Sequence, residues 1–167
     1  MLRNDYLFDD LSAVEKLASR LLTPTVLDES LSSGVFVLVD SKVKGNALLN
    51  QLAILLADGG AHVTHLLATD LVGQEIQASL AQVFGSQHTL SVLLLEEAQE
   101  LLLDPAGDSV LRSLKAARDA MNLSHLRPGK FILIATGTSP ADILRLVSDP
   151  LQAFYGATAA TITEFDV

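Results

Sequence analysis

The sequence predicts an α/β protein in which helices cover both faces of a mostly parallel, five-stranded sheet. Short apolar segments typical of strands alternate with longer segments whose apolar residues recur at helical spacing. Two strand segments, residues 89–95 and 130–135, are almost wholly apolar, as strands covered on both faces are. Parallel strands also need crossover connections of about this length, so the alternation favours a layered arrangement around one sheet.

The length and composition favour a single domain. A chain of 167 residues can bury roughly 70% of its unfolded surface, so it can fold without disulfides or metal. Hydrophobic residues make up 49% of the chain and charged residues 19%, which excludes an intrinsically disordered protein. We expect one domain over residues 1–167, with a leading helix and connector in 1–34 and the layered core in 35–167.

Composition also disfavours several classes of function. The chain has no cysteine, which excludes disulfides, thiolate zinc sites and a cysteine nucleophile. Its formal net charge of −9 would repel a phosphate backbone, so we expect no direct nucleic-acid binding. No apolar segment approaches the roughly 20 residues that span a bilayer, and residues 1–10 lack the apolar centre of a signal peptide. We therefore expect a cytoplasmic protein with no membrane insertion.

The elements follow from hydrophobic periodicity and from Gly, Pro and capping residues. An amphipathic helix over residues 7–22 and a connector over 23–34 precede the first strand. We expect strands at residues 35–39, 61–68, 89–95, 130–135 and 157–165. We expect further helices at residues 46–57, 71–84, 109–121 and 141–147.

The ligand site of such a sheet lies beyond the carboxyl ends of its strands. Polar residues are expected at four of these ends: Asp40, Asp70, Glu96 and Thr136. Residues 137–140 follow the last of them and have two interpretations. They can form an anion-binding turn at a helix N-terminus, or Ser139 can cap the helix with Pro140 at its first position, which the capping preferences favour.

The segment after the first strand stands where P-loop NTPases carry Gly-x-x-x-x-Gly-Lys-Ser/Thr. The eight positions are Asp40, Ser41, Lys42, Val43, Lys44, Gly45, Asn46 and Ala47. Only Gly45 fits: Asn46 carries no charge for the phosphates, Ala47 has no magnesium ligand, and Asp40 adds a negative charge. Lys42 and Lys44 either reach a phosphate from elsewhere in the loop or are exposed loop lysines.

Two segments carry a resemblance to a known family. LSVLLLEEAQELL is similar to a Walker B strand and FILIATGTSPADILRLV to a sensor strand, followed by LQAFYGA. The chain resembles bacterial AAA-type ATPases, especially the ExeA and MshM kind. The resemblance implies a three-layer αβα P-loop NTPase-like fold with ATP and magnesium as cofactors. By the same resemblance Glu96 would hold magnesium, Glu97 would activate water, and Thr136 lies nearest the sensor of the γ-phosphate.

The chain departs from that family at several points. Glu96 replaces an Asp, Arg145 stands early for an arginine finger, and the sequence ends without the small helical lid. The alternative interpretation of Glu96 and Glu97 is a pair of solvated acids at a strand end that cap the next segment. His62 and His65 are three residues apart on a predicted strand, so they point to opposite faces and make a poor metal pair.

Three hypotheses about function follow. The first is a degenerate AAA-type domain that does not hydrolyse ATP and acts as a scaffold or regulatory protein-interaction module. The second is an active ATPase with a deviant P-loop that uses Lys44 or Lys42, Glu96 and Glu97. The third is a RecA-like fold without Walker motifs, such as the Elongator subunits. The resemblance also implies a protein partner or a homo-oligomer, because AAA-type cores usually pack side by side.

Overall fold

The computed structural model describes residues 11–22, 29–72, 76–83, 90–123 and 129–161. Its strands are β1 (Val35–Leu38), β2 (His62–Leu67), β3 (Leu90–Glu96), β4 (Lys130–Gly137) and β5 (Thr158–Thr161). They form one sheet in the order β2-β3-β4-β1-β5, and each pair of neighbours is parallel. The predicted parallel sheet of five strands is confirmed.

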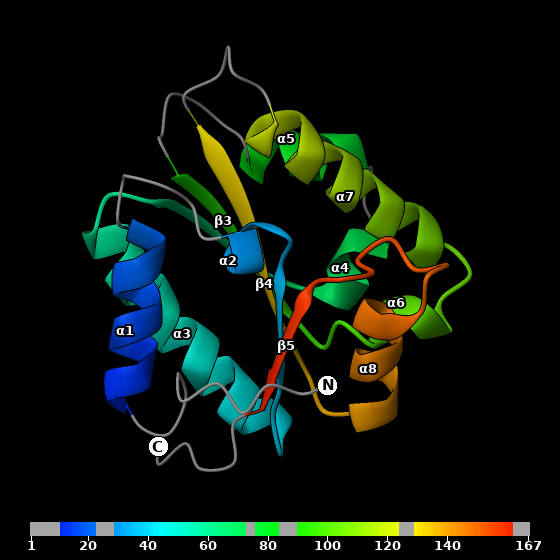
Figure 1. Cartoon of the computed structure of the whole chain (residues 1–167), viewed down its shortest axis with the longest axis horizontal. Coiled ribbons are helices and arrows are strands. Elements are labelled where there is room, and N and C mark those ends of the chain that lie inside the picture. Colours follow the sequence, from blue (N-terminus) through cyan, green and yellow to red (C-terminus); the bar gives the residue numbers. More distant parts are fainter. Residues whose placement is uncertain (1–10, 23–28, 73–75, 84–89, 124–128, 162–167) are drawn as a thin grey trace.

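Helices cover both faces of this sheet (Figure 1). The helices are α1 (Leu11–Leu22), α2 (Glu29–Ser32), α3 (Lys42–Asp58), α4 (Ala68–Val72), α5 (Ile76–Val83), α6 (Glu100–Leu103), α7 (Gly107–Asn122) and α8 (Pro140–Ser148). Helices α1 and α3 share a core cluster with one face, and α4 to α8 share a second cluster with the other. The architecture is therefore three layers, helix on sheet on helix.

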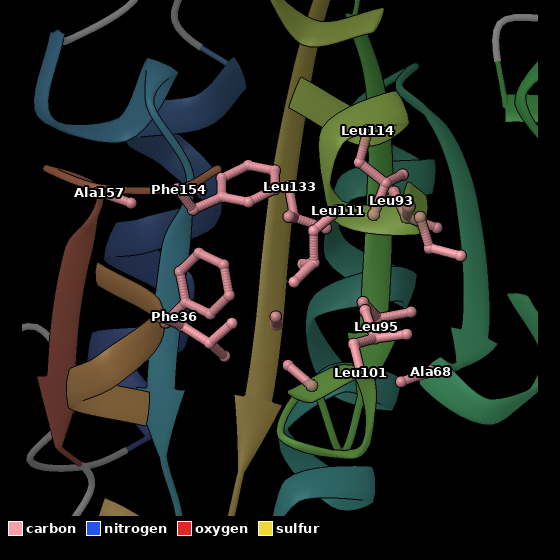
Figure 2. Packing of buried hydrophobic residues seen from close by; sticks show 14 of the residues in the cluster. Phe36, Ala68, Leu93, Leu95, Leu101, Leu111, Leu114, Leu133, Phe154 and Ala157 are labelled. Atoms are coloured by element: carbon pink, nitrogen blue, oxygen red, sulfur yellow. The ribbon is translucent and has the colours of Figure 1, made fainter. Parts of the chain in front are cut away.

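Alternation along the strands divides the core between these two layers. In β3, Val92 and Leu94 pack with α1 and α3, whereas Leu93 and Leu95 pack with the helices on the opposite face. Figure 2 shows the second cluster, in which the Phe36 and Phe154 rings meet edge to face with centroids 5.5 Å apart. Burial on both faces explains why these strands read as continuous apolar runs.

Two predicted helices have different bounds in the structure. The helix expected at residues 46–57 begins at Lys42, because Ser41 caps it and accepts a hydrogen bond from the Lys44 amide. Of the helix expected at 71–84, the structure describes α4, which begins earlier at Ala68, and α5, whereas residues 73–75 and 84 lie outside the described residues. Residues 7–10 and 162–165 of predicted elements lie outside the described residues.

The end of the fourth strand also differs from the prediction. Strand β4 continues to Gly137, so Thr136 lies within the sheet and not beyond it. Ser139 then caps α8, accepting from the Asp142 amide, with Pro140 in the first turn. The N-cap interpretation of this turn is confirmed.

The strand order contains one topological switch point. Helix α3 leads from β1 towards β2 at one edge of the sheet, whereas α8 leads from β4 to β5 on the other side of β1. The carboxyl ends of β1 and β4 therefore flank the crevice where ligands of open α/β sheets bind. Within the described residues, no helix combines the length and apolar character needed to cross a bilayer.

Candidate functional site at the carboxyl ends of the strands

The turn from β1 into α3 is short. Only residues 39–41 separate the end of β1 from Lys42, the first residue of α3. The Lys44 amide donates to Ser41 Oγ at 3.2 Å, and the Gly45 amide donates to the Ser41 carbonyl at 3.0 Å. In a P-loop the backbone amides of the loop cradle phosphates. Here the corresponding amides of Lys44 and Gly45 are already bonded within the first helical turn.

The charged residues of this turn are exposed and partly paired with each other. Lys44 Nζ lies 3.3 Å from Asp40 Oδ2, with 37% and 60% of the two side chains exposed. Exposed pairs of this kind contribute about 0–1 kcal/mol. Lys42 is exposed at the start of the helix. Lys44, the lysine next to Gly45, is thus paired with Asp40 from the same turn.

Gly45 and Thr136 meet across the switch point. A Cβ on Gly45 would lie 3.1 Å from Val39 Cγ2 and 3.3 Å from Thr136 Oγ1. Gly45 is buried, and Thr136 is only 1% exposed. Ala47, half-buried, packs against the α1 and α3 side of the core. The two predicted site residues are close together, and the contact between them is tight.

Asn46, at the position of the motif's lysine, contacts the predicted magnesium ligand. Asn46 Nδ2 donates to Glu96 Oε1 at 2.7 Å, and His65 Nε2 lies 2.6 Å from the same oxygen. Asn50 Nδ2 donates in turn to Asn46 Oδ1 at 2.8 Å. The Glu96 side chain is 13% exposed. One oxygen of the Glu96 carboxylate is therefore contacted by two side chains, Asn46 from α3 and His65 from β2.

Glu97 occupies a second, separate cluster. It is 7% exposed and has a φ of 57°, a conformation uncommon for a residue with a side chain. Its carboxylate accepts hydrogen bonds from Gln99 Nε2 and from Thr138 Oγ1, the latter at 3.3 Å. Gln99 Nε2 also donates to Thr138 Oγ1 at 3.2 Å. Neither Glu96 nor Glu97 is a solvated acid, so that interpretation is wrong.

The Glu97 cluster is accommodated by a glycine at the end of β4. A Cβ on Gly137 would lie 2.5 Å from Gln99 Oε1 and would also meet Ile143. The backbone adds a link between the strands, since the Ala98 amide donates to the Thr136 carbonyl at 2.9 Å. Glu97, Gln99 and Thr138 thus tie the end of β3 to the end of β4.

The sequence analysis did not predict three residues that contact these acids. His65 contacts Glu96, and Gln99 and Thr138 donate hydrogen bonds to Glu97. His65 reaches Glu96 because β2 neighbours β3 with His65 opposite Leu94, and residues two apart share a face. Strand order is a tertiary property, so no local pattern indicates this pairing. For Thr138 the sequence does offer a signal, because it lies two residues after Thr136 and both are polar.

Two other predicted residues lie away from these clusters. Asp70 is exposed within α4, because β2 ends before it at Leu67. Arg145 is 57% exposed on α8, with Nε 4.0 Å from Asp149 Oδ2. Across the described part of the chain, no group of three or more His, Cys, Asp or Glu is arranged to hold a metal ion.

The sheet order, the two helical layers and the switch point define a P-loop NTPase-like α/β fold. Comparison with solved structures supports this class. Over 98% of its length, the chain is similar to Aeropyrum pernix Orc1, solved in complex with DNA, with a TM-score of 0.63 and 13% identity. It is also similar to Saccharomyces cerevisiae Rif2, with a TM-score of 0.53, 9% identity and 94% of this chain covered.

A second Rif2 structure, in complex with the C-terminal domain of Rap1, matches 97% of this chain with a TM-score of 0.54 and 10% identity. The chain spans about half the length of these proteins, 48% of Orc1 and 55% of Rif2. At these identities the likeness shows the fold. No protein-family model and no curated protein matches the chain. The resemblance to the ExeA and MshM kind stays a prediction.

Proposed function

We propose that this domain is a non-hydrolysing, P-loop NTPase-like module that acts as a scaffold or regulatory partner through protein–protein contacts. The observation that carries the proposal is the first turn of α3. It begins at Lys42, so residues that would form a phosphate-binding loop belong to a capped helix. A P-loop presents free backbone amides to the β and γ phosphates, whereas here the amides of Lys44 and Gly45 are already hydrogen-bonded within the helix.

The side chains support the same conclusion, because they do not fit a magnesium–nucleotide pair. Asn46 and Ala47 supply neither the cation nor the hydroxyl of the motif. The carboxylate of Glu96, which the resemblance implies as the magnesium ligand, is instead contacted by Asn46 and His65. The Glu97 carboxylate, which would have to accept a proton from water, is buried and bonded to Gln99 and Thr138.

A protein partner is favoured over nucleic acid. One neighbour, Rif2, is solved with a protein, the C-terminal domain of Rap1, whereas Orc1 is solved with DNA. The net charge of −9 opposes a phosphate backbone, which protein surfaces attract with clustered Lys and Arg. We therefore extend to this chain the protein-binding precedent and not the DNA-binding one.

The test is titration of magnesium–ATP into the purified chain by calorimetry, with thermal melting at the same nucleotide concentrations. We expect no binding heat and no rise in melting temperature up to millimolar ATP, since any ligand of the native state must stabilise it. Glu97→Gln run in parallel would preserve bound ATP if hydrolysis obscured binding. Micromolar binding, or ATP hydrolysis that Glu97→Gln abolishes, would overturn the proposal in favour of a deviant ATPase.

A double variant tests whether the backbone or the side chains prevent nucleotide binding. Asn46→Lys with Ala47→Thr restores the motif's chemistry while leaving Ser41 as the helix cap. We expect this double variant to remain without nucleotide affinity, because the backbone of α3 is unchanged. Measurable binding by the double variant would mean that side chains alone had removed the site. Lys44→Ala is the matched control, since the deviant-ATPase hypothesis requires it to reduce affinity.

A further inference from the structure

Strand β5 lies at an edge of the sheet and carries only small side chains. Within the described sheet its four residues, Thr158–Thr161, pair with β1 and with no other strand. Ala160 is the one buried residue of β5, whereas all residues of β3 from Leu90 to Leu95 are buried. Segments that bury few apolar side chains open locally at low free-energy cost. The position of β5 therefore depends on an anchor outside the strand.

The anchor is Phe154, in the turn between α8 and β5. We name residues 149–161 the β5 strap. Phe154 is 1% exposed and is the one large buried side chain of the strap, since the other buried residues are Ala157 and Ala160. Leu151 of the same turn is 82% exposed. The strap is therefore attached to the core mainly through one aromatic ring.

The Phe154 ring is enclosed by residues from two other parts of the chain. It meets Phe36 of β1 edge to face, with centroids 5.5 Å apart (Figure 2). A Cβ on Gly34 would lie 3.5 Å from Phe154 Cδ1, so the backbone before β1 comes close to the ring. The guanidinium carbon of Arg118, from α7, lies 5.3 Å from the ring centroid, within the range of a cation–π contact.

Arg118 is held in place by contacts outside the strap. Its Nη1 donates to the Ser33 carbonyl at 2.7 Å, and its Nε and Nη2 donate to Asp119 Oδ1 at 2.9 and 2.7 Å. The Arg118 side chain is 12% exposed. Burial raises the pKa of the Asp119 carboxyl, but its hydrogen bonds with Arg118 and Lys115 outweigh burial and lower the pKa below its ordinary value. The charged Asp119 thus fixes the guanidinium as a preformed surface for the ring.

We propose that the β5 strap is a releasable element that closes when Phe154 docks against Arg118 and Phe36, and that opens while the other four strands stay paired. Because β5 is bonded only to β1 in the described sheet, its release leaves the order β2-β3-β4-β1 intact. Release uncovers the backbone edge of β1 over Val35–Leu38, and an uncovered edge presents unpaired donors and acceptors.

The docking site of the ring lies at the amino ends of β1 and β5, because Ser33 and Gly34 precede β1 and Phe154 precedes β5. Release therefore does not involve the residues at the carboxyl ends of the strands. It changes the surface that a protein partner of the module meets, and only this consequence rests on the proposed function.

Native-state hydrogen exchange of the full chain, followed by mass spectrometry, tests whether β5 opens by itself. After correction for intrinsic rates, we expect the β5 amides to exchange at least about tenfold faster than the β3 amides. Urea below the unfolding midpoint should accelerate exchange in β3 more than in β5, because local release exposes less surface than global unfolding. Equal protection of the two strands, with equal dependence on urea, would overturn the proposal.

Two substitutions separate local release from global unfolding. Arg118→Ala removes a contact that is lost in both events, so it should accelerate exchange of β5 and β3 alike, by about tenfold. Val92→Ala deletes buried methyl groups of β3, three strands away from β5, so it should accelerate β3 about tenfold and leave β5 within about twofold of its native rate. Equal acceleration of β5 and β3 by Val92→Ala would mean that β5 opens only with the whole domain, against the proposal.

The matched control for the arginine is Arg112→Ala. Arg112 lies on the same helix, is 68% exposed and pairs with the exposed Asp108. An exposed pair contributes little to stability, so exchange in both strands should stay within about twofold of the native rates. An effect on β5 as large as that of Arg118→Ala would contradict a specific role of Arg118.

A double-variant cycle tests the contact between Arg118 and Phe154. Phe154→Leu keeps a buried apolar side chain but removes the ring face that the guanidinium contacts. Combined with Arg118→Ala, it should accelerate β5 exchange by at least about threefold less than the product of the two separate factors, because both variants break the same contact. Arg118→Lys, which keeps the charge but not the planar guanidinium, replaces the alanine variant if that variant does not fold. Simple multiplication of the two factors would overturn Arg118 as part of the closure.

The nucleotide titration and the exchange measurements fail independently. Absence of ATP binding together with global opening of β5 would leave the non-hydrolysing module standing and remove the releasable strap. Local opening of β5 accompanied by micromolar ATP binding would do the reverse.

Discussion

The start of α3 and the end of β3 lie at the same edge of the sheet but differ in how they compare with the P-loop pattern. At the start of α3 the backbone itself differs, since a capped helical turn replaces a loop. At the end of β3 the residues are similar to the family pattern, and Glu97 is held by Gln99 and Thr138. The comparison teaches that backbone conformation sets the first region, whereas hydrogen bonds between side chains set the second.

Matched glycine substitutions test the rigidity of the two regions and should give the largest difference. Gly137→Ala places a methyl group 2.5 Å from Gln99 Oε1 and against Ile143 in a buried position, so we expect a loss of about 1–3 kcal/mol in unfolding free energy. Gly45→Ala meets its nearest atom at 3.1 Å, and about 0.5–1 kcal/mol of gained helix propensity offsets that tightness. Urea denaturation of both variants measures the difference. Similar losses would mean that the two regions are equally tight.

Substitutions of Glu97 separate its side-chain bonds from its backbone conformation. Glu97→Ala removes the acceptor of one buried and one partly buried hydrogen bond and should cost about 1–3 kcal/mol. Glu97→Gly makes the same deletion but relieves the left-handed backbone at φ 57°, so it should cost less than the alanine variant. Chemical denaturation ranks the two. If the glycine variant is the less stable, the backbone carries no strain that matters to stability.

The smallest effect is expected at the contact between α3 and β3. Asn46→Ala removes the donor to Glu96, but alanine is the better helix former and the Asn46 side chain is exposed, so we expect a loss below about 1 kcal/mol. His65→Ala and the double variant complete a thermodynamic cycle. Because Asn46 and His65 share one oxygen of Glu96, their effects should be coupled and therefore not additive. Additivity within about 0.3 kcal/mol would mean that the two contacts are independent.

Local pattern was sufficient for most elements and insufficient for the site. The apolar runs of β3 and β4 predicted buried parallel strands because both their faces are covered. Ser139 before Pro140 predicted the start of α8 through capping chemistry. The start of α3 was misplaced because the phosphate motif was used as the template, although Ser41 is itself an N-cap residue whose preference is local. Reading that serine by its capping preference would have placed α3 correctly.

What the sequence by itself determined is the fold class, the number of strands in the core and the presence of Asn and Ala at positions 46 and 47, because periodicity and residue chemistry are local properties. Only the tertiary structure decided which side chains meet. Because β2 and β3 are neighbours in the sheet, His65 lies next to Glu96. Because β1 and β4 are neighbours, Gly45 lies next to Thr136. Contacts between residues far apart in the chain depend on strand order and register, and neither is encoded in the spacing of any one segment.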